Sequence, residues 1–201
     1  LAGTSARGTG AAFVLSDITI GGSSATAHAI GEVANTNLCA IRGLAVPAGS
    51  AGDTVVTFSA NVARCTIIVA AIVGAINTTP LDTASDNDGS AVVGDLTETL
   101  DLDTRAGGVV FAMAQGATVT TLTLAFTGLT NDTQQDIEAL RTMAAIANID
   151  AGEAPRTVSV LFDTGVADSI FGPSSCAVSF APIIGRGLLL GSKLERTRFA
   201  R

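Results

Sequence analysis

Apolar and polar residues alternate with a period of two along much of the chain, and short turn-forming stretches separate the alternating runs. Residues 54–62 show this alternation, which predicts a half-buried β-strand because successive side chains of a strand point to opposite faces. Residues 64–73 are nearly all apolar and rich in β-branched side chains, which predicts a central strand covered on both faces.

The clearest alternation lies in residues 92–103. Leu96, Leu100 and Leu102 share one face of the expected strand, and acidic side chains occupy the other. We expect that acidic set, with Glu98 in part, to face water.

Further strands are expected wherever a similar run ends at glycine, proline or a polar cluster. They cover residues 11–20, 25–30, 37–46, 109–114, 118–126, 156–163 and 174–182, whereas residues 47–53 and 80–90 are expected to be loops. Strands and turns that recur about every ten residues predict an all-β fold, an antiparallel β-sandwich of the jelly-roll or immunoglobulin-like kind. We assign residues 1–182 to this domain and residues 183–201 to an extended C-terminal arm.

One segment favours strand and helix equally. Residues 134–146 contain good helix formers, with Thr130 or Asn131 as a candidate N-cap, and Ile137, Leu140 and Ala144 share a helical face. A short helix near 134–146 is therefore retained beside the strand alternative.

The composition indicates more apolar surface than an isolated domain hides. Hydrophobic residues make up 47% of the 201 residues and charged residues 14%, with a mean hydropathy of +0.49. We expect the excess to face a neighbouring subunit, as in a homo-oligomer. Tryptophan and tyrosine are absent from the sequence, so aromatic platforms for sugars or bases are scarce.

Charge is distributed unevenly. The formal net charge is −7, yet the last segment is basic, through Arg186, Lys193, Arg196, Arg198 and Arg201. An acidic body repels phosphates, so no nucleic-acid partner is expected. The basic arm either docks on an acidic neighbour as an assembly arm or is a solvated tail.

The apolar runs are too short to cross a bilayer, which needs about 20 apolar residues, so no membrane partner is expected. The first residues lack an initiator methionine and the layout of a signal peptide. We therefore expect Leu1 to lie inside a longer coding sequence.

Candidate chemistry is sparse, and we expect neither an enzyme nor a cofactor. His28 is the single histidine, expected on an exposed strand, so no second imidazole is available as a base. Cys39, Cys65 and Cys176 are odd in number and widely spaced, which favours buried free thiols over a disulfide framework or a zinc site.

An acidic stretch is the one candidate for a metal. Asp82, Asp86 and Asp88 could present oxygen ligands to calcium, although the spacing does not match an EF-hand loop. The alternative is a solvated surface turn, and no metal is assigned.

A resemblance rests on four short motifs: TVVTF at 54–58, NVARCTIIV at 61–69, AGGVVFA at 106–112 and FTGLTND at 126–132. Together with later segments, they resemble a family of β-sandwich virion structural proteins from tailed phages and prophages of α-proteobacteria. The similarity spans roughly residues 11–182. The chain departs from the family in two ways. It lacks the family's tryptophans near the last motif, and the family's expected first strand would lie before residue 1.

The resemblance implies a structural role in a tailed bacteriophage virion, in capsid decoration, a head spike, the tail or a fibre, with other virion proteins as partners. The alternative is a receptor- or carbohydrate-binding module of a phage tail tip or an extracellular protein, with a host-surface receptor as partner.

Overall fold

The structure is a computed structural model of the 201-residue chain. It describes residues 1–9, 12–33, 36–45, 52–72, 78–89, 91–118, 121–137, 139–150, 155–166 and 168–182. Within these ranges every regular element is a strand or bridge and none is a helix, which confirms the all-β prediction.

Two sheets are formed mainly by the N-terminal part of the chain. Sheet 1 has the order β3-β2-β6, and sheet 2 has the order β4-β5-β1-β7, with antiparallel pairing throughout. Their strands are β1 (Ala2–Gly8), β2 (Leu15–Ile20), β3 (Ser23–Ser24), β4 (Thr26–Val33), β5 (Asn37–Gly43), β6 (Thr54–Phe58) and β7 (Val62–Val69).

The remaining strands form the other two sheets. Sheet 3 has the order β13-β14-β11-β16-β8, with β9 also paired to β16, and sheet 4 has the order β10-β15-β12. Their strands are β8 (Asp82–Asn87), β9 (Ala91–Val93), β10 (Leu96–Leu102), β11 (Val109–Ala117), β12 (Thr123–Thr127), β13 (Thr130–Ile137), β14 (Leu140–Asn148), β15 (Arg156–Asp163) and β16 (Ser169–Phe180).

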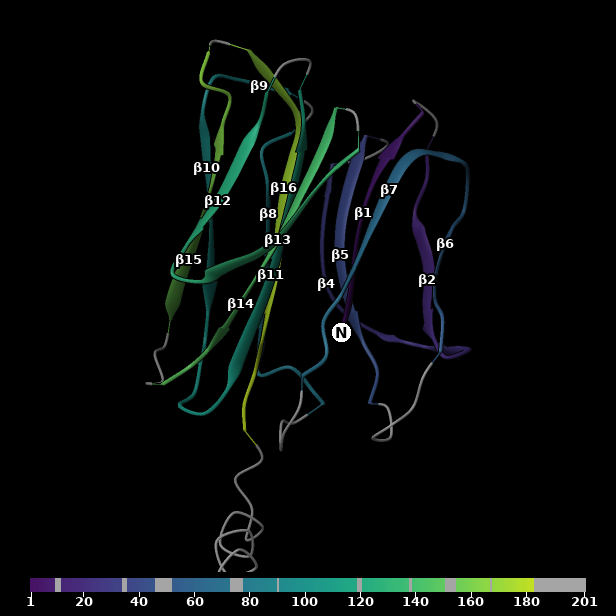
Figure 1. Cartoon of the computed structure of the whole chain (residues 1–201), viewed down its shortest axis with the longest axis vertical. Coiled ribbons are helices and arrows are strands. Elements are labelled where there is room, and N and C mark those ends of the chain that lie inside the picture. Colours follow the sequence, from purple (N-terminus) through teal and green to yellow (C-terminus); the bar gives the residue numbers. More distant parts are fainter. Residues whose placement is uncertain are drawn as a thin grey trace, which may run out of the picture.

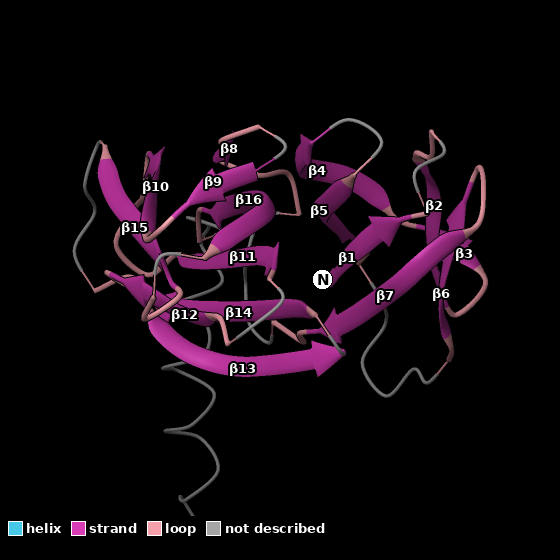
Figure 2. Ribbon diagram, turned by 90° about the horizontal axis from the view of Figure 1, so that it is seen from above, coloured by secondary structure: helices cyan, strands magenta, loops and turns pink. Residues whose placement is uncertain are grey.

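The four sheets are stacked in the order 1-2-3-4, so the protein is a layered β-sandwich with three interfaces (Figures 1 and 2). Leu100, Phe126 and Phe162 belong to the core between sheets 4 and 3, whereas Phe111 and Ile41 belong to the core between sheets 3 and 2. A smaller core between sheets 2 and 1 is built around Phe13, Leu38 and the partly buried Phe58. Sheets 2 and 3 are thus packed on both faces over most of their strands, which accounts for much of the high apolar content.

Strand β1 was not predicted, because its sequence AGTSARG lacks large apolar residues. It nevertheless lies between β5 and β7 in sheet 2, and its first five residues are buried. Small side chains suit this position because sheet 3 lies close: a Cβ on Gly3 would be 1.7 Å from the Sδ of Met113. Here size, rather than hydrophobicity, selects the residues.

Of the two alternatives left open for residues 134–146, the short helix is wrong and the strand is confirmed. The segment forms parts of β13 and β14, a hairpin in which β14 also pairs with β11 over nine register positions from Ala117↔Leu140 to Val109↔Asn148. Met143 faces the core with sheet 4 and Ala144 the core with sheet 2, so pairing and burial on both faces outweigh helix propensity.

The loop predicted at 80–90 is also wrong in part. Residues Asp82–Asn87 form β8, the edge strand of sheet 3, in antiparallel register with β16 from Ser179↔Asp82 to Ser174↔Asn87. Its polar residues suit an edge, where side chains on one face remain in water.

The predicted central strand at 64–73 is an edge strand instead. Strand β7 ends sheet 2, and within the described part of the chain β1 is the one strand paired with it. Thr66 and Ile68 are buried, whereas Ile67 and Val69 between and after them are 36% and 58% exposed. One face of this apolar strand is covered by the chain itself. The other face is exposed at Ile67 and Val69, and we call these two side chains the bare face of β7.

Candidate functional site

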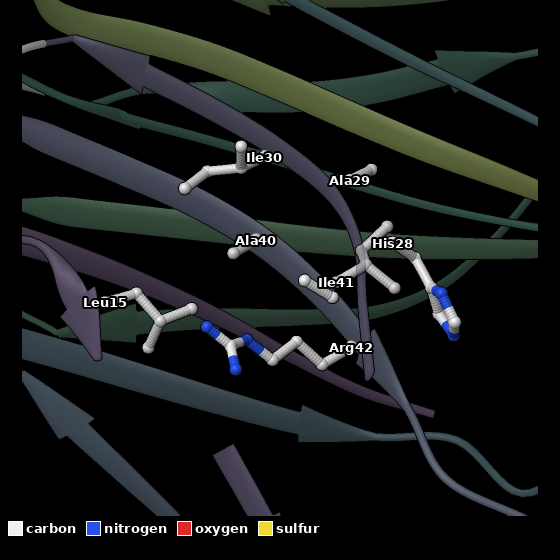
Figure 3. A pocket seen from close by; sticks show the side chains of 8 residues that line it. Leu15, His28, Ala29, Ile30, Ala40, Ile41 and Arg42 are labelled. Atoms are coloured by element: carbon white, nitrogen blue, oxygen red, sulfur yellow. The ribbon is translucent and has the colours of Figure 1, made fainter. Parts of the chain in front are cut away.

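The single histidine lines a shallow hollow on the surface of β4 and β5. The hollow has a volume of about 120 Å³ and is lined mainly by aliphatic side chains of β4 and β5, with His28 and Arg42 as its charged or titratable members. Figure 3 shows that the imidazole of His28 and the guanidinium of Arg42 point away from each other. The two groups therefore do not converge on one ligand atom.

Both groups have partners elsewhere. Arg42 Nη1 forms an ion pair with Asp17 Oδ1 at 3.1 Å, and the His28 ring packs edge-on against Phe180 with centroids 5.5 Å apart. The prediction that His28 is exposed is wrong: the side chain is half-buried, and this burial lowers its pKa. An imidazole that packs edge-on against a phenylalanine ring is placed as a packing residue.

The three aspartates considered for calcium lie on or next to β8, and two of them bind backbone. Asp82 Oδ2 accepts a hydrogen bond from the Asp103 amide at 2.9 Å, and Asp86 Oδ2 accepts one from the Thr99 amide at 3.3 Å. Asp88 follows the strand and is exposed. Over the described part of the chain, no group of three or more His, Cys, Asp or Glu side chains is arranged to hold a metal ion.

These carboxylates join two sheets. Strand β8 ends sheet 3 and β10 ends sheet 4, so both present unpaired backbone groups at neighbouring edges of the sandwich. Asp82 and Asp86 accept hydrogen bonds from amides on and just after β10, which replaces a backbone ladder with side-chain acceptors. Asp82 and Asp86 thus join the edges of sheets 3 and 4 through hydrogen bonds.

Glu98 is the most perturbed carboxyl group among the described residues. It lies on β10 beside the leucines, 1% exposed, and its Oε2 accepts a hydrogen bond from Ser175 Oγ at 2.5 Å. Burial raises its pKa from 4.5 to about 8, with repulsion from Asp86 and Asp88 adding to the rise and the Ser175 hydrogen bond opposing it. The expectation that Glu98 partly faces water is wrong. Its position in the alternating pattern, on the same face of the strand as Leu96, Leu100 and Leu102, indicated burial.

A buried polar seam links sheets 2 and 3. Ser5 Oγ on β1 and Thr142 Oγ1 on β14 are 2.5 Å apart and share a hydrogen bond, and Thr142 Oγ1 lies 3.5 Å from Thr66 Oγ1 on β7. All three side chains are buried, so each hydroxyl needs such a partner. Sequence pattern could not pair these residues because they are far apart along the chain.

A second part of the seam lies where the register between β11 and β16 shifts. Gly172 has a positive φ of 54°, and its carbonyl accepts hydrogen bonds from Asn37 Nδ2 at 3.0 Å and from Gln115 Nε2 at 3.1 Å. Asn37 Nδ2 also donates to the Phe171 carbonyl at 2.7 Å. The side-chain amides of Asn37 and Gln115 thereby bond to backbone carbonyls at this irregularity.

Free thiols are found at all three cysteines, as predicted. Cys39 and Cys176 are fully buried at the interface of sheets 2 and 3, and Cys65 is half-buried with its Sγ 3.4 Å from Thr4 Oγ1. Local sequence pattern could not predict that Cys39 and Cys176 would be neighbours, because they are far apart along the chain.

The basic residues proposed for an assembly arm, Arg186, Lys193, Arg196, Arg198 and Arg201, lie outside the described residues. In the part of the chain that is described, no helix is long and apolar enough to cross a membrane. Comparison of the chain with protein-family models, curated proteins and solved structures finds no match.

Proposed function

We propose that this protein is a structural component of a tailed-phage virion that acts by packing against other virion proteins. The observation that carries the proposal is the bare face of β7. Ile67 and Val69 stand on the same side of an edge strand and are 36% and 58% exposed. Exposed β-branched side chains on an open edge are the features that a neighbouring chain covers in an assembly.

The backbone of β7 supports the same proposal. Leu1 and Ala70 exchange both of their backbone hydrogen bonds, at 2.8 and 2.9 Å. Because bonded and non-bonded pairs alternate in an antiparallel ladder, the amides and carbonyls of Val69 and Ile67 point away from β1. A partner strand could bond to these groups while its side chains cover the two aliphatic residues.

The rest of the fold holds this edge in place. Strand β1 pairs with β7 from Ala2↔Val69 to Gly8↔Val62, and Thr66 and Ile68 anchor the inner face of β7 on sheet 3. An edge that is rigid before binding loses little conformational entropy when a partner docks. A stack of four sheets therefore suits a part that has to present a fixed edge.

The resemblance to phage β-sandwich proteins points in the same direction, since one of its motifs, residues 61–69, contains β7. A role in capsid decoration, a head spike, the tail or a fibre agrees with this surface. The basic residues of the arm at 183–201 would add attraction to an acidic neighbour.

The direct test is to tag the protein in a prophage-carrying host, induce and purify particles, and image them with a gold-conjugated antibody to the tag. We expect a fixed position and a constant copy number on each particle. Absence of the protein from purified particles, together with a strictly monomeric mass in solution, would refute the proposal. Specific binding of that monomer on a glycan array would instead favour the receptor-binding alternative.

A further inference from the structure

Two cysteines that are distant in sequence lie in contact across the central interface. The Sγ atoms of Cys39 on β5 and Cys176 on β16 are 3.3 Å apart, and both residues are fully buried. Cys39 belongs to sheet 2 and Cys176 to sheet 3, so the contact joins the two sheets in the middle of the stack.

The strands hold both cysteines from either side. Cys39 is paired with Ser5 of β1 and Gly31 of β4, and Cys176 is paired with Met113 of β11 and Ser85 of β8. Neither strand is an edge of its sheet, so neither thiol can move away without breaking a ladder on each side.

The two sheets also come unusually close beside this pair. A Cβ on Gly31, next to Cys39 in sheet 2, would lie 2.5 Å from the backbone oxygen of Ser175, which precedes Cys176. Only glycine fits at such a separation. The close approach of the backbones keeps the two sulfur atoms in contact.

We propose that Cys39 and Cys176 are a latent cross-link, two thiols placed to form a disulfide that joins sheet 2 to sheet 3. A disulfide bond is about 2.05 Å long, so the sulfur atoms must approach by roughly 1.3 Å, which side-chain rotation and small shifts of the sheets can supply. This modification is independent of the assembly role proposed above.

The oxidant is a small-molecule disulfide. The thiolate of one cysteine attacks a sulfur of the oxidant, breaks its S–S bond and expels one thiolate, leaving a mixed disulfide. The second cysteine, as its thiolate, attacks the protein sulfur of the mixed disulfide and expels the other thiolate. Two S–H bonds are lost, one S–S bond forms, the two protons go to the expelled thiolates, and the oxidant is reduced to two thiols.

Burial determines when the reaction occurs. Attack requires a thiolate, and burial together with contact with Cys176 raises the pKa of Cys39 well above its usual value. The closed interface also excludes the oxidant, since both residues are fully buried. The bond therefore forms while sheets 2 and 3 are closing during folding, and the reduced protein, once folded, is oxidised slowly.

The test is to refold the full chain with reduced or with oxidised glutathione and to alkylate the remaining thiols in denaturant. With reduced glutathione all three cysteines should be alkylated, and with oxidised glutathione Cys65 alone. Before alkylation, the oxidised protein should be lighter than the reduced protein by about 2 Da, and its digest should contain a peptide pair linked through Cys39 and Cys176. It should also melt about 10 °C higher than the reduced protein, because the bond closes a long loop.

Cysteine variants provide the controls. Cys65→Ser should form the cross-link as the wild type does. Cys39→Ala and Cys176→Ala should show no rise in Tm on oxidation, each compared with its own reduced form. Because a truncated core residue can impair folding, the wild-type peptide map is decisive. Alkylation of all three thiols after oxidative refolding, or a map that links Cys65 to either partner, overturns the proposal.

Discussion

Glu98 makes the stability of this protein depend on pH in a direction opposite to that of a salt-bridged carboxylate. Its pKa rises from 4.5 to about 8 on folding, because the carboxyl group is buried between sheets 3 and 4 with Ser175 Oγ as its hydrogen-bond donor. Between these two pKa values the folded state binds more protons than the unfolded state. The free energy of unfolding therefore falls as pH rises through this window.

The magnitude follows from the same two values. One unit of pKa shift corresponds to about 1.4 kcal/mol, so Glu98 should remove roughly 3 kcal/mol of stability between pH 5 and pH 8. The contribution is fully present below pH 4.5 and is lost as pH approaches 8. That loss is a large fraction of the free energy of unfolding of folded proteins, which is typically about 5–15 kcal/mol.

Glu98→Gln isolates this effect. The amide oxygen can still accept the Ser175 hydrogen bond, yet the side chain cannot ionise, so the variant should keep the roughly 3 kcal/mol that the wild type loses. Urea unfolding followed by far-ultraviolet circular dichroism at pH 5, 6, 7 and 8 measures the difference, since the chain has no tryptophan to report by fluorescence. Asp101→Asn, at an exposed position of the same strand, is the matched control and should keep the wild-type slope. Equal pH slopes for the wild type and Glu98→Gln would refute the reasoning.

Two further predictions concern contacts between sheets. Gly31→Ala should lower the free energy of unfolding by about 1–3 kcal/mol, and by more than Gly3→Ala does. The methyl group added at Gly31 meets the fixed backbone oxygen of Ser175 at 2.5 Å, whereas at Gly3 it meets the side chain of Met113, which can rotate. Equal losses for the two variants in urea unfolding would contradict this. Asp82→Ala and Asp86→Ala should each lower the free energy of unfolding by roughly 1 kcal/mol, because each leaves a backbone amide at β10 without its acceptor. Neither added calcium nor a chelator should shift the wild-type Tm, and a calcium-dependent rise in Tm would show that the carboxylates bind metal instead.

Sequence pattern was sufficient for the fold class and for strands in which alternation is strong. Leu100 and Leu102 are buried on β10 as their period predicts, and β6 coincides with the predicted strand start at Thr54. Sequence pattern failed where pairing with distant strands determines the secondary structure. Strand β14 reads as a helix until β11 and β13 flank it, and β1 has too few large apolar residues to be recognised.

The stacking of the sheets was beyond the reach of local pattern. Alternation shows that a strand has two faces, but not whether the second face meets water or another sheet. Strand β7 illustrates the limit: its apolar sequence predicted burial on both faces, and the chain covers one. For the same reason the contacts of Glu98 with Ser175 and of Cys39 with Cys176, which join residues 77 and 137 positions apart, could not be predicted.

The proposed assembly role requires a neighbouring chain to cover the bare face of β7, and a charge placed there tests this most directly. Val69→Lys introduces a cation at a 58% exposed position, and Val93→Lys, at a 72% exposed position on β9, is the control. Both variants should melt within about 2 °C of the wild type, because neither side chain is in a core. The measurement is incorporation of each variant into purified particles, compared with the wild type in the same preparation. We predict that Val69→Lys is excluded and that Val93→Lys is incorporated; normal incorporation of Val69→Lys would contradict the account.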